Sequence, residues 1–141
     1  MRLWHKDLLP YLPKQQLVAQ WCELNSIYAK QDKHILINYV YEYDKTDLYY
    51  YSILVINEMK KRIYKIRNFD KYNKYFQEYK DKIALFYTEN IFKNHQNEEY
   101  LKICCWNLYE KYLRGQEGFT DEAVTFIKSV ISKRLCKKGT K

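Results

Sequence analysis

One glutamate is placed where a carboxylate can do chemistry. Glu23 falls in a segment whose apolar residues recur at steps of three and four, the spacing of the buried face of a helix. At about 100° per residue, Glu23 lies on the opposite, polar face together with Gln16, Ala19 and Lys30. We therefore expect this carboxylate to face solvent or a ligand and not the core. The simpler interpretation of the same pattern is an ordinary solvated glutamate.

The histidines and cysteines show no spacing typical of a catalytic or metal site. His5, His34 and His95 are far apart in the sequence, and each is expected to cap a helix or pack in the core. At Lys33 and His34, near the start of a predicted helix, a phosphate contact is the alternative. The chain has no CxxC pair, so we expect no metal, no cofactor and reduced thiols in a cytoplasmic protein.

Two further stretches combine aromatic side chains in ways that suit nucleic acid. Between Arg67 and Lys82, aromatic residues alternate with lysines, which can stack bases and bind phosphates. Trp106, Tyr109 and Tyr112 can likewise form an edge that contacts bases. For both stretches, packing of the aromatic side chains in the core is the simpler expectation.

The scarcity of chain-breaking residues predicts helices as the scaffold for all of these side chains. Three glycines and two prolines in 141 residues are too few for the tight turns of a barrel or sandwich. The first helix should have Pro13 in its first turn and bury Leu17, Trp21, Leu24 and Tyr28. Further helices are expected over residues 32–43, from 46 or 47 to 65, over 67–82, from Asn97 to Gly115, and from Thr120 onward. In the helix that ends at residue 65, Glu58, Lys60, Lys61 and Arg62 should reach water.

Length and charge limit what such a helical chain can be. Hydrophobic residues make up 47% of the 141 residues, which predicts a packed, all-α, compact fold: one domain over residues 1–141 with a basic tail at about 133–141. The net charge of +8 favours a polyanionic partner. Codon bias in an AT-rich genome explains the excess of lysine and tyrosine equally well. The chain lacks a signal-peptide pattern and a long apolar run, so no membrane segment is expected.

The segment 12–24 resembles the first helix of the pyrimidine-dimer DNA glycosylases of the phage endonuclease V type. The shared residue types stand at Leu12, Gln15, Leu17, Ala19, Glu23 and Leu24. The likeness continues to Lys33 and His34, returns at residues 58–62 and recurs near His95. The opening residues 1–5 and 11–13 are most similar to an uncharacterised bacterial branch of that family.

The resemblance implies a compact helical DNA glycosylase with abasic-site lyase activity. In the family, the N-terminal amine attacks the sugar of a damaged nucleotide, and β-elimination then cuts the strand. By this resemblance Met1 supplies the amine, and Glu23 supplies the carboxylate that stabilises the cationic sugar. The residues expected to contact DNA are Arg2, Gln16, Lys30, Lys33 and His34. The implied partner is damaged duplex DNA, bound by a monomer.

The chain departs from the family at positions that matter for binding. Cys22 and Ser26 stand where the family has arginines, and Gln16 stands where it has a histidine. The loss of these cations should weaken phosphate binding. Arg2 is too bulky for removal of the initiator methionine, so the nucleophile would be the amine of Met1 itself. Two alternatives follow: a non-catalytic helical module that binds nucleic acid through its lysines, and a protein-interaction domain.

Overall fold

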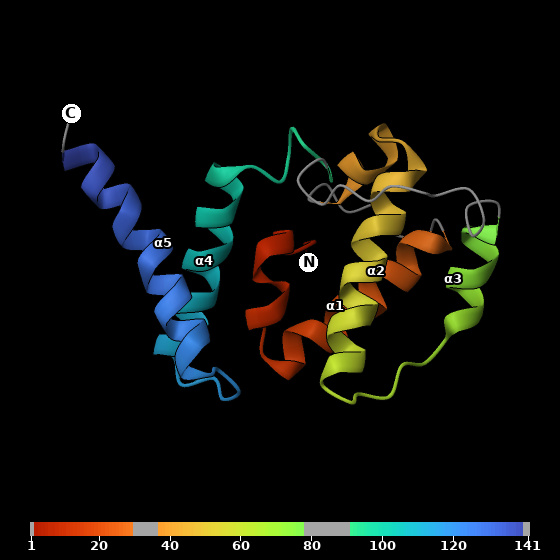
Figure 1. The fold of residues 1–141 in the computed structure, drawn as a ribbon, viewed down its shortest axis with the longest axis horizontal. Helices are drawn as coiled ribbons and strands as arrows, with labels where there is room; N and C mark the ends of the chain where they lie inside the picture. The colour runs from red at the N-terminus through yellow and green to blue at the C-terminus, as the bar shows by residue number, and fades with distance from the viewer. Residues whose placement is uncertain (1, 30–36, 78–90, 140–141) are drawn as a thin grey trace.

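The fold is all-α, as the sequence predicts. The computed structural model describes residues 2–29, 37–77 and 91–139, with side chains up to residue 133 (Figure 1). Met1, Lys30, Lys33, His34 and the side chains of the basic tail after Lys133 lie outside this description. The described elements are the 3-10 helices η1 (Lys6–Tyr11) and η2 (Asn38–Glu42) and the α-helices α1 (Lys14–Tyr28), α2 (Lys45–Lys61), α3 (Phe69–Tyr75), α4 (Glu98–Leu113) and α5 (Asp121–Gly139).

Local capping residues set most helix boundaries. The side chain of Asn97 accepts a hydrogen bond from Tyr100 N at 3.0 Å at the start of α4, and Thr120 accepts one from Ala123 N at 3.0 Å at the start of α5. Both caps confirm the sequence prediction. Helix α2 begins slightly earlier than predicted, because Asp44 rather than Thr46 or Asp47 caps it.

Two predicted helices are shorter than expected. In the described part of residues 32–43 the chain forms the five-residue 3-10 helix η2 and no α-helix. In the described part of residues 67–82, helix α3 has seven residues, and it begins only at Phe69 because Asn68 is left-handed with φ of 63°. Tyr72 and Phe76 of this stretch are buried, as the core interpretation predicts, whereas Lys71 and Lys74 are exposed. Its aromatic residues therefore serve packing.

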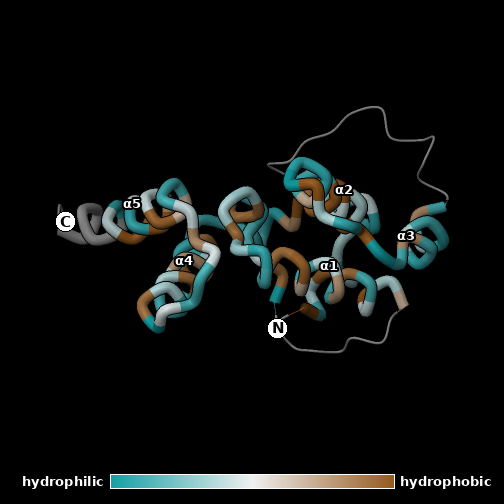
Figure 2. Tube along the Cα trace, turned by 90° about the horizontal axis from the view of Figure 1, so that it is seen from below, coloured by the Kyte–Doolittle hydropathy of each residue, from teal (hydrophilic) through white to brown (hydrophobic). Residues whose placement is uncertain are grey.

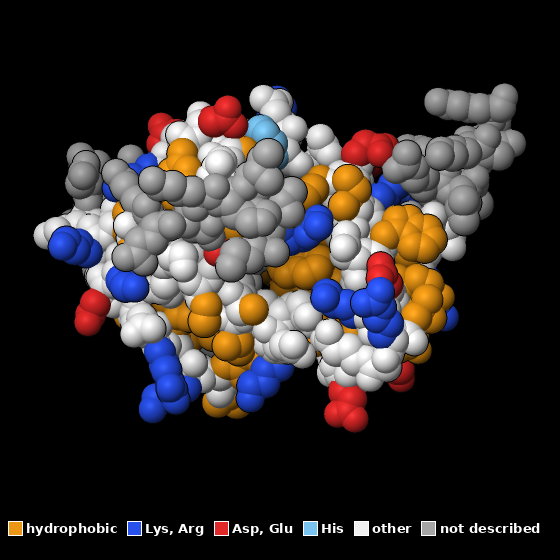
Figure 3. Space-filling view, turned by 180° about the vertical axis from the view of Figure 1, so that it is seen from behind, with side chains coloured by type: hydrophobic (Ala, Val, Ile, Leu, Met, Phe, Trp, Pro, Cys, Tyr) orange, Lys and Arg blue, Asp and Glu red, His pale blue; other side chains and the backbone are white. Residues whose placement is uncertain are grey.

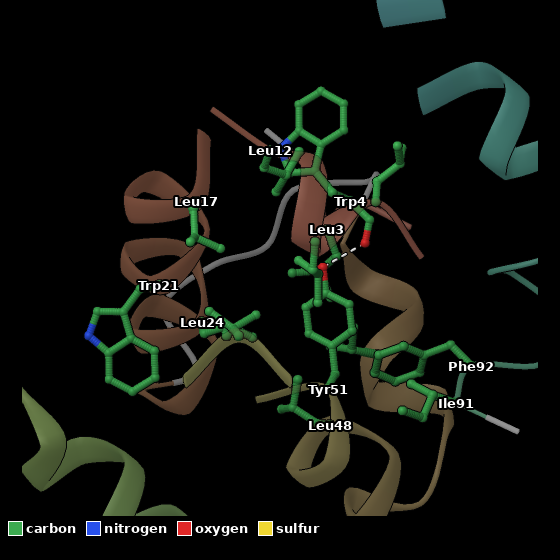
Figure 4. Close-up of a cluster of buried hydrophobic side chains, with 14 of the residues drawn as sticks. Leu3, Trp4, Leu12, Leu17, Trp21, Leu24, Leu48, Tyr51, Ile91 and Phe92 are labelled. Atoms are coloured by element: carbon green, nitrogen blue, oxygen red, sulfur yellow. Dashed lines mark hydrogen bonds between the residues drawn. The ribbon is translucent and has the colours of Figure 1, made fainter. Parts of the chain in front are cut away.

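The core lies between α1 and α2 and is closed by η1 and α3. The four residues predicted for the buried face of α1 are buried: Leu17, Trp21, Leu24 and Tyr28. Tyr51 of α2 is fully buried at the centre, against the N-terminal residues Leu3 and Trp4 (Figure 4). Cys104 of α4 and Ile127 of α5 belong to the same cluster of buried side chains.

Helices α4 and α5 pack side by side at one end of the molecule, and α1, α2 and α3 gather at the other (Figures 1 and 2). The N-terminal segment, residues 2–5, and η1 lie between these two groups. None of the helices in the described ranges has the length and hydropathy that a membrane crossing requires. The arrangement brings α4, late in the sequence, beside residues at the very start of the chain.

Arg62 does not reach water in the way the sequence predicts. Its guanidinium donates to Leu12 O at 2.6 Å and to Pro10 O at 3.0 Å, and it pairs with Glu58 at 2.7 Å. The connection from η1 to α1 passes over the last turn of α2, and its carbonyl groups need donors there. Arg62 therefore ties the first connection of the chain to α2.

Candidate active site

A cleft of about 620 Å³ opens between the N-terminal segment, α1 and α4. We call it the first cleft. Its lining residues are Arg2, Trp4, Gln15, Gln16, Ala19, Gln20, Cys22, Glu23, Ser26, Asn107 and Lys111. The polar face of α1 forms one wall, so side chains that the sequence places opposite the core meet in this cleft.

Glu23 lies in the wall of the first cleft and not in open solvent. Only 9% of its surface is exposed, because the N-terminal segment and α4 cover the polar face of α1. The prediction that Glu23 is an ordinary solvated glutamate is therefore wrong. The cleft also contains Arg2 and Lys111, so the carboxylate shares it with two cationic side chains.

Gln20, one turn before Glu23 on the same face of α1, holds the backbone of the N-terminal segment. Its Oε1 accepts a hydrogen bond from Trp4 N at 2.7 Å. Its Nε2 donates to Arg2 O at 3.3 Å. Gln20 is 2% exposed, and a buried amide with both ends bonded has one favourable orientation. The backbone of residues 2–4 is thus fixed against the helix that carries Glu23.

Two buried tyrosines hold the same segment from the other sides. The hydroxyl of Tyr51 in α2 donates to Trp4 O at 2.6 Å (Figure 4). The hydroxyl of Tyr100 in α4 donates to Leu3 O at 2.5 Å. Burial raises the pKa of both phenols well above the usual value, so both remain protonated donors. The N-terminal segment is therefore anchored by three helices.

The structure brings together three of the residues that the sequence singles out. Arg2, Gln16 and Glu23 all line the first cleft. Gln16 is engaged there with Gln116 through a reciprocal amide pair, at 2.7 and 3.2 Å. This pair joins α1 to the chain segment between α4 and α5.

The histidines that the structure describes lie outside the first cleft. His5 is 3% exposed, and its Nδ1 accepts a hydrogen bond from Asp7 N, which confirms a capping and core role. His95 stacks on Tyr39 with ring centroids 4.4 Å apart, and its Nδ1 lies 2.6 Å from the hydroxyl of Tyr43. Among the side chains in the described ranges, no group of three or more His, Cys, Asp or Glu is placed to hold a metal ion.

Sequence reasoning missed three residues of the first cleft: Trp4, Asn107 and Lys111. No local signal marks Asn107 or Lys111, since their position depends on how α4 packs. Gln20 can be placed beside Glu23 from the sequence, because it is one turn away on the same face of α1.

Of the three aromatic residues of α4 expected in the core, Tyr109 packs against it and the other two do not. Trp106 is 50% exposed and Tyr112 is 38% exposed. The reason is that α4 turns Cys104, Cys105 and Leu108 into the core instead. Trp106 directly precedes Asn107 and so stands beside the first cleft.

The match to a known family covers the N-terminal segment and α1, two of the three parts of the chain that line the first cleft. A family model described as pyrimidine dimer DNA glycosylase matches residues 1–72, which include the N-terminal segment, α1 and α2. No curated protein and no solved structure matches the chain significantly. The matched residues make up just over half of the 141 residues. The chain therefore belongs to the pyrimidine dimer DNA glycosylase family.

Proposed function

We propose that the protein is a DNA glycosylase with abasic-site lyase activity on damaged duplex DNA, acting as a monomer. The amine of Met1 is the nucleophile, and Glu23 is the carboxylate that assists it. The observation that carries this proposal is the anchoring of residues 2–4 beside Glu23. Met1 is bonded directly to Arg2, whose carbonyl group is held by Gln20 and whose side chain lines the first cleft, and such anchoring favours a nucleophile on this residue.

The chemistry suits an α-amine better than a lysine. An α-amine has a reference pKa near 8, so at pH 7 about a tenth of it is neutral and nucleophilic. The neutral nitrogen attacks C1′ of the damaged nucleotide, the glycosidic bond breaks, and the base leaves with the electron pair and takes up a proton. The nitrogen loses a proton and the sugar ring opens, which yields a Schiff base.

Strand cleavage follows from the same intermediate. Removal of a C2′ proton expels the 3′ phosphate by β-elimination, and water then hydrolyses the Schiff base and frees the amine. Positive charge develops on the sugar in the first step, and a carboxylate at that position stabilises it. Glu23 is sheltered in the cleft wall, where a charge acts more strongly than in open water.

Borohydride trapping on abasic-site DNA tests this proposal. The wild-type protein should form a covalent adduct whose peptide map places the link on the amine of Met1. Glu23→Gln should lower the rate of adduct formation by at least tenfold, whereas Glu42→Gln, an exposed glutamate in η2, should leave it unchanged. Blocking the amine with an N-terminal extension should abolish the adduct. An adduct that forms equally well with Glu23→Gln, or on a lysine, contradicts the mechanism.

A second candidate function has its own support. Cys22 and Ser26 line the first cleft with neutral side chains at positions where the family resemblance places cations. A non-catalytic helical module would bind intact and damaged duplex equally and form no adduct. A preference for damaged duplex at constant salt excludes this alternative.

A further inference from the structure

We propose that a second cleft of this protein also binds the DNA, and that Ile63 inserts its side chain between base pairs there. This inference rests on DNA being the partner, as proposed above. It does not depend on which residue acts as the nucleophile.

The second cleft adjoins the first. It also has a volume of about 620 Å³ and lies between α1, the end of α2 and the segment that leads into α3. Its lining residues are Lys14, Val18, Trp21, Cys22, Asn25, Ser26, Met59, Ile63, Tyr64, Lys65, Arg67, Asn68 and Lys71. Cys22 and Ser26 line both clefts, so a ligand that fills the first reaches the second across α1.

The charge of the second cleft suits a phosphate backbone. None of the described lining residues is acidic. Four of them are cationic, namely Lys14, Lys65, Arg67 and Lys71. Lys and Arg side chains also lie beside hydrophobic surface along the lower edge of the molecule (Figure 3). Duplex DNA has charged phosphates along its backbones and an apolar stack of bases between them, so it fits a surface that is both cationic and hydrophobic.

Ile63 is the most exposed large hydrophobic residue of the described chain. It is 90% exposed at the rim of the second cleft. Its backbone is left-handed, with φ of 62°, which is unfavourable for a side chain branched at Cβ. An isoleucine here costs free energy through its backbone and gains nothing by burial.

The end of α4 shows how the same backbone is formed without this cost. Helix α2 ends with hydrogen bonds from Tyr64 N to Met59 O and from Ile63 N to Lys60 O. The equivalent two bonds close α4, and the left-handed position there is Gly115, with φ of 93°. Because glycine suits this helix end, the fold does not require an isoleucine at position 63. Insertion between bases gives the side chain a use, since small apolar wedges unstack base steps in this way.

A buried acceptor in the second cleft independently indicates a ligand. Asn25 is 6% exposed, and its Nδ2 donates to Trp21 O at 2.9 Å. Its Oδ1 has no hydrogen-bond partner among the described residues. Buried polar atoms are nearly always paired, so a donor brought into the cleft would satisfy this oxygen. The amino groups of adenine, cytosine and guanine are such donors.

The test uses two variants of the full chain, Ile63→Gly and Ile63→Asn. Both suit a left-handed backbone and remove the apolar side chain, so both should raise the melting temperature. Affinity for intact duplex should fall about tenfold, the value of one buried isoleucine side chain. A duplex carrying 2-aminopurine should brighten at one position with the wild-type protein, as the base unstacks, and stay dark with both variants. Leu113→Ala, which shortens an exposed apolar side chain at the end of α4, is the matched control.

The outcomes separate this inference from the proposed activity. If the wild-type protein forms no adduct with abasic DNA but the Ile63 variants lose affinity and 2-aminopurine brightening, the second cleft stands and the proposed activity fails. If the adduct forms normally and both Ile63 variants bind and unstack the duplex like wild type, the inference is overturned.

Discussion

At the scale of single residues, His5 links the anchoring of the N-terminal segment to pH. Its ring is 3% exposed, and burial lowers its pKa from 6.5 to about 4. Nδ1 accepts a hydrogen bond from Asp7 N at 3.1 Å, which only an unprotonated Nδ1 can do. Between pH 4 and 6.5 the unfolded chain therefore binds a proton that the folded chain does not.

The free energy of unfolding should consequently decrease as the pH falls from about 6.5 to about 4. The loss due to His5 should be about 3 kcal/mol, since each pKa unit corresponds to about 1.4 kcal/mol. Urea unfolding at pH 7, 5.5 and 4 measures it against His5→Asn, which keeps an acceptor for the cap but does not titrate. Equal pH dependence of the two proteins would show that His5 is protonated without cost in the folded state.

Of the residues that line the first cleft, the periodicity of the sequence indicates Glu23, and the family resemblance adds Arg2 and Gln16. Periodicity places Glu23 away from the core of α1, and the structure confirms that it faces a cleft. Periodicity does not reveal that this polar face is covered, because the covering residues belong to the N-terminal segment and to α4. The roles of Gln20 and Lys111 depend on the same long-range packing, which no local pattern encodes.

At the scale of elements, boundaries set by local chemistry were predictable, and those set by tertiary contacts were not. Asn97 and Thr120 cap their helices through hydrogen bonds within the first turn, so the sequence alone indicates them. The 3-10 helix Asn38–Glu42 instead packs Tyr39 against Phe92 and His95, which are more than fifty residues away. Such contacts override the local preference for an α-helix.

Arg62 provides the prediction that belongs to this scale. Its planar guanidinium donates at once to Leu12 O, Pro10 O and Glu58, and so joins η1 and α1 to the last turn of α2. A lysine keeps the charge but has no planar fork, so Arg62→Lys leaves carbonyl oxygens unpaired. We expect the variant to lose about 2 kcal/mol of unfolding free energy. Lys61→Ala at the neighbouring exposed position should change it by less than about 0.5 kcal/mol.

Thermal and urea unfolding measure this difference directly. If Arg62→Lys is as stable as wild type, the three acceptors are satisfied by water, and the connection between η1 and α1 is not held by this side chain. Arg62, which lies within the family-matched part of the chain, would then have no structural role in the described fold.

At the scale of the whole molecule, two adjoining clefts give part of the +8 charge a definite location. Arg2 and Lys111 line the first cleft, and Lys14, Lys65, Arg67 and Lys71 line the second. The composition of the chain does not distinguish charge placed for a ligand from charge that follows codon usage. The structure adds that these six cations come from distant segments and line clefts on either side of α1, where a polyanion can contact them.

The salt dependence of DNA binding tests this clustering. Each phosphate neutralised by a cation contributes about −0.9 to the slope of log K against log salt, so six contacts predict a slope near −5 on duplex DNA. Replacing Lys65 and Lys71 together by alanine should make the slope about two units shallower. Replacing the exposed pair Lys60 and Lys61 removes the same net charge and should leave the slope unchanged, since neither residue lines a cleft. Equal changes in both double variants would mean that DNA senses only the total charge, and the two-cleft surface would then be wrong.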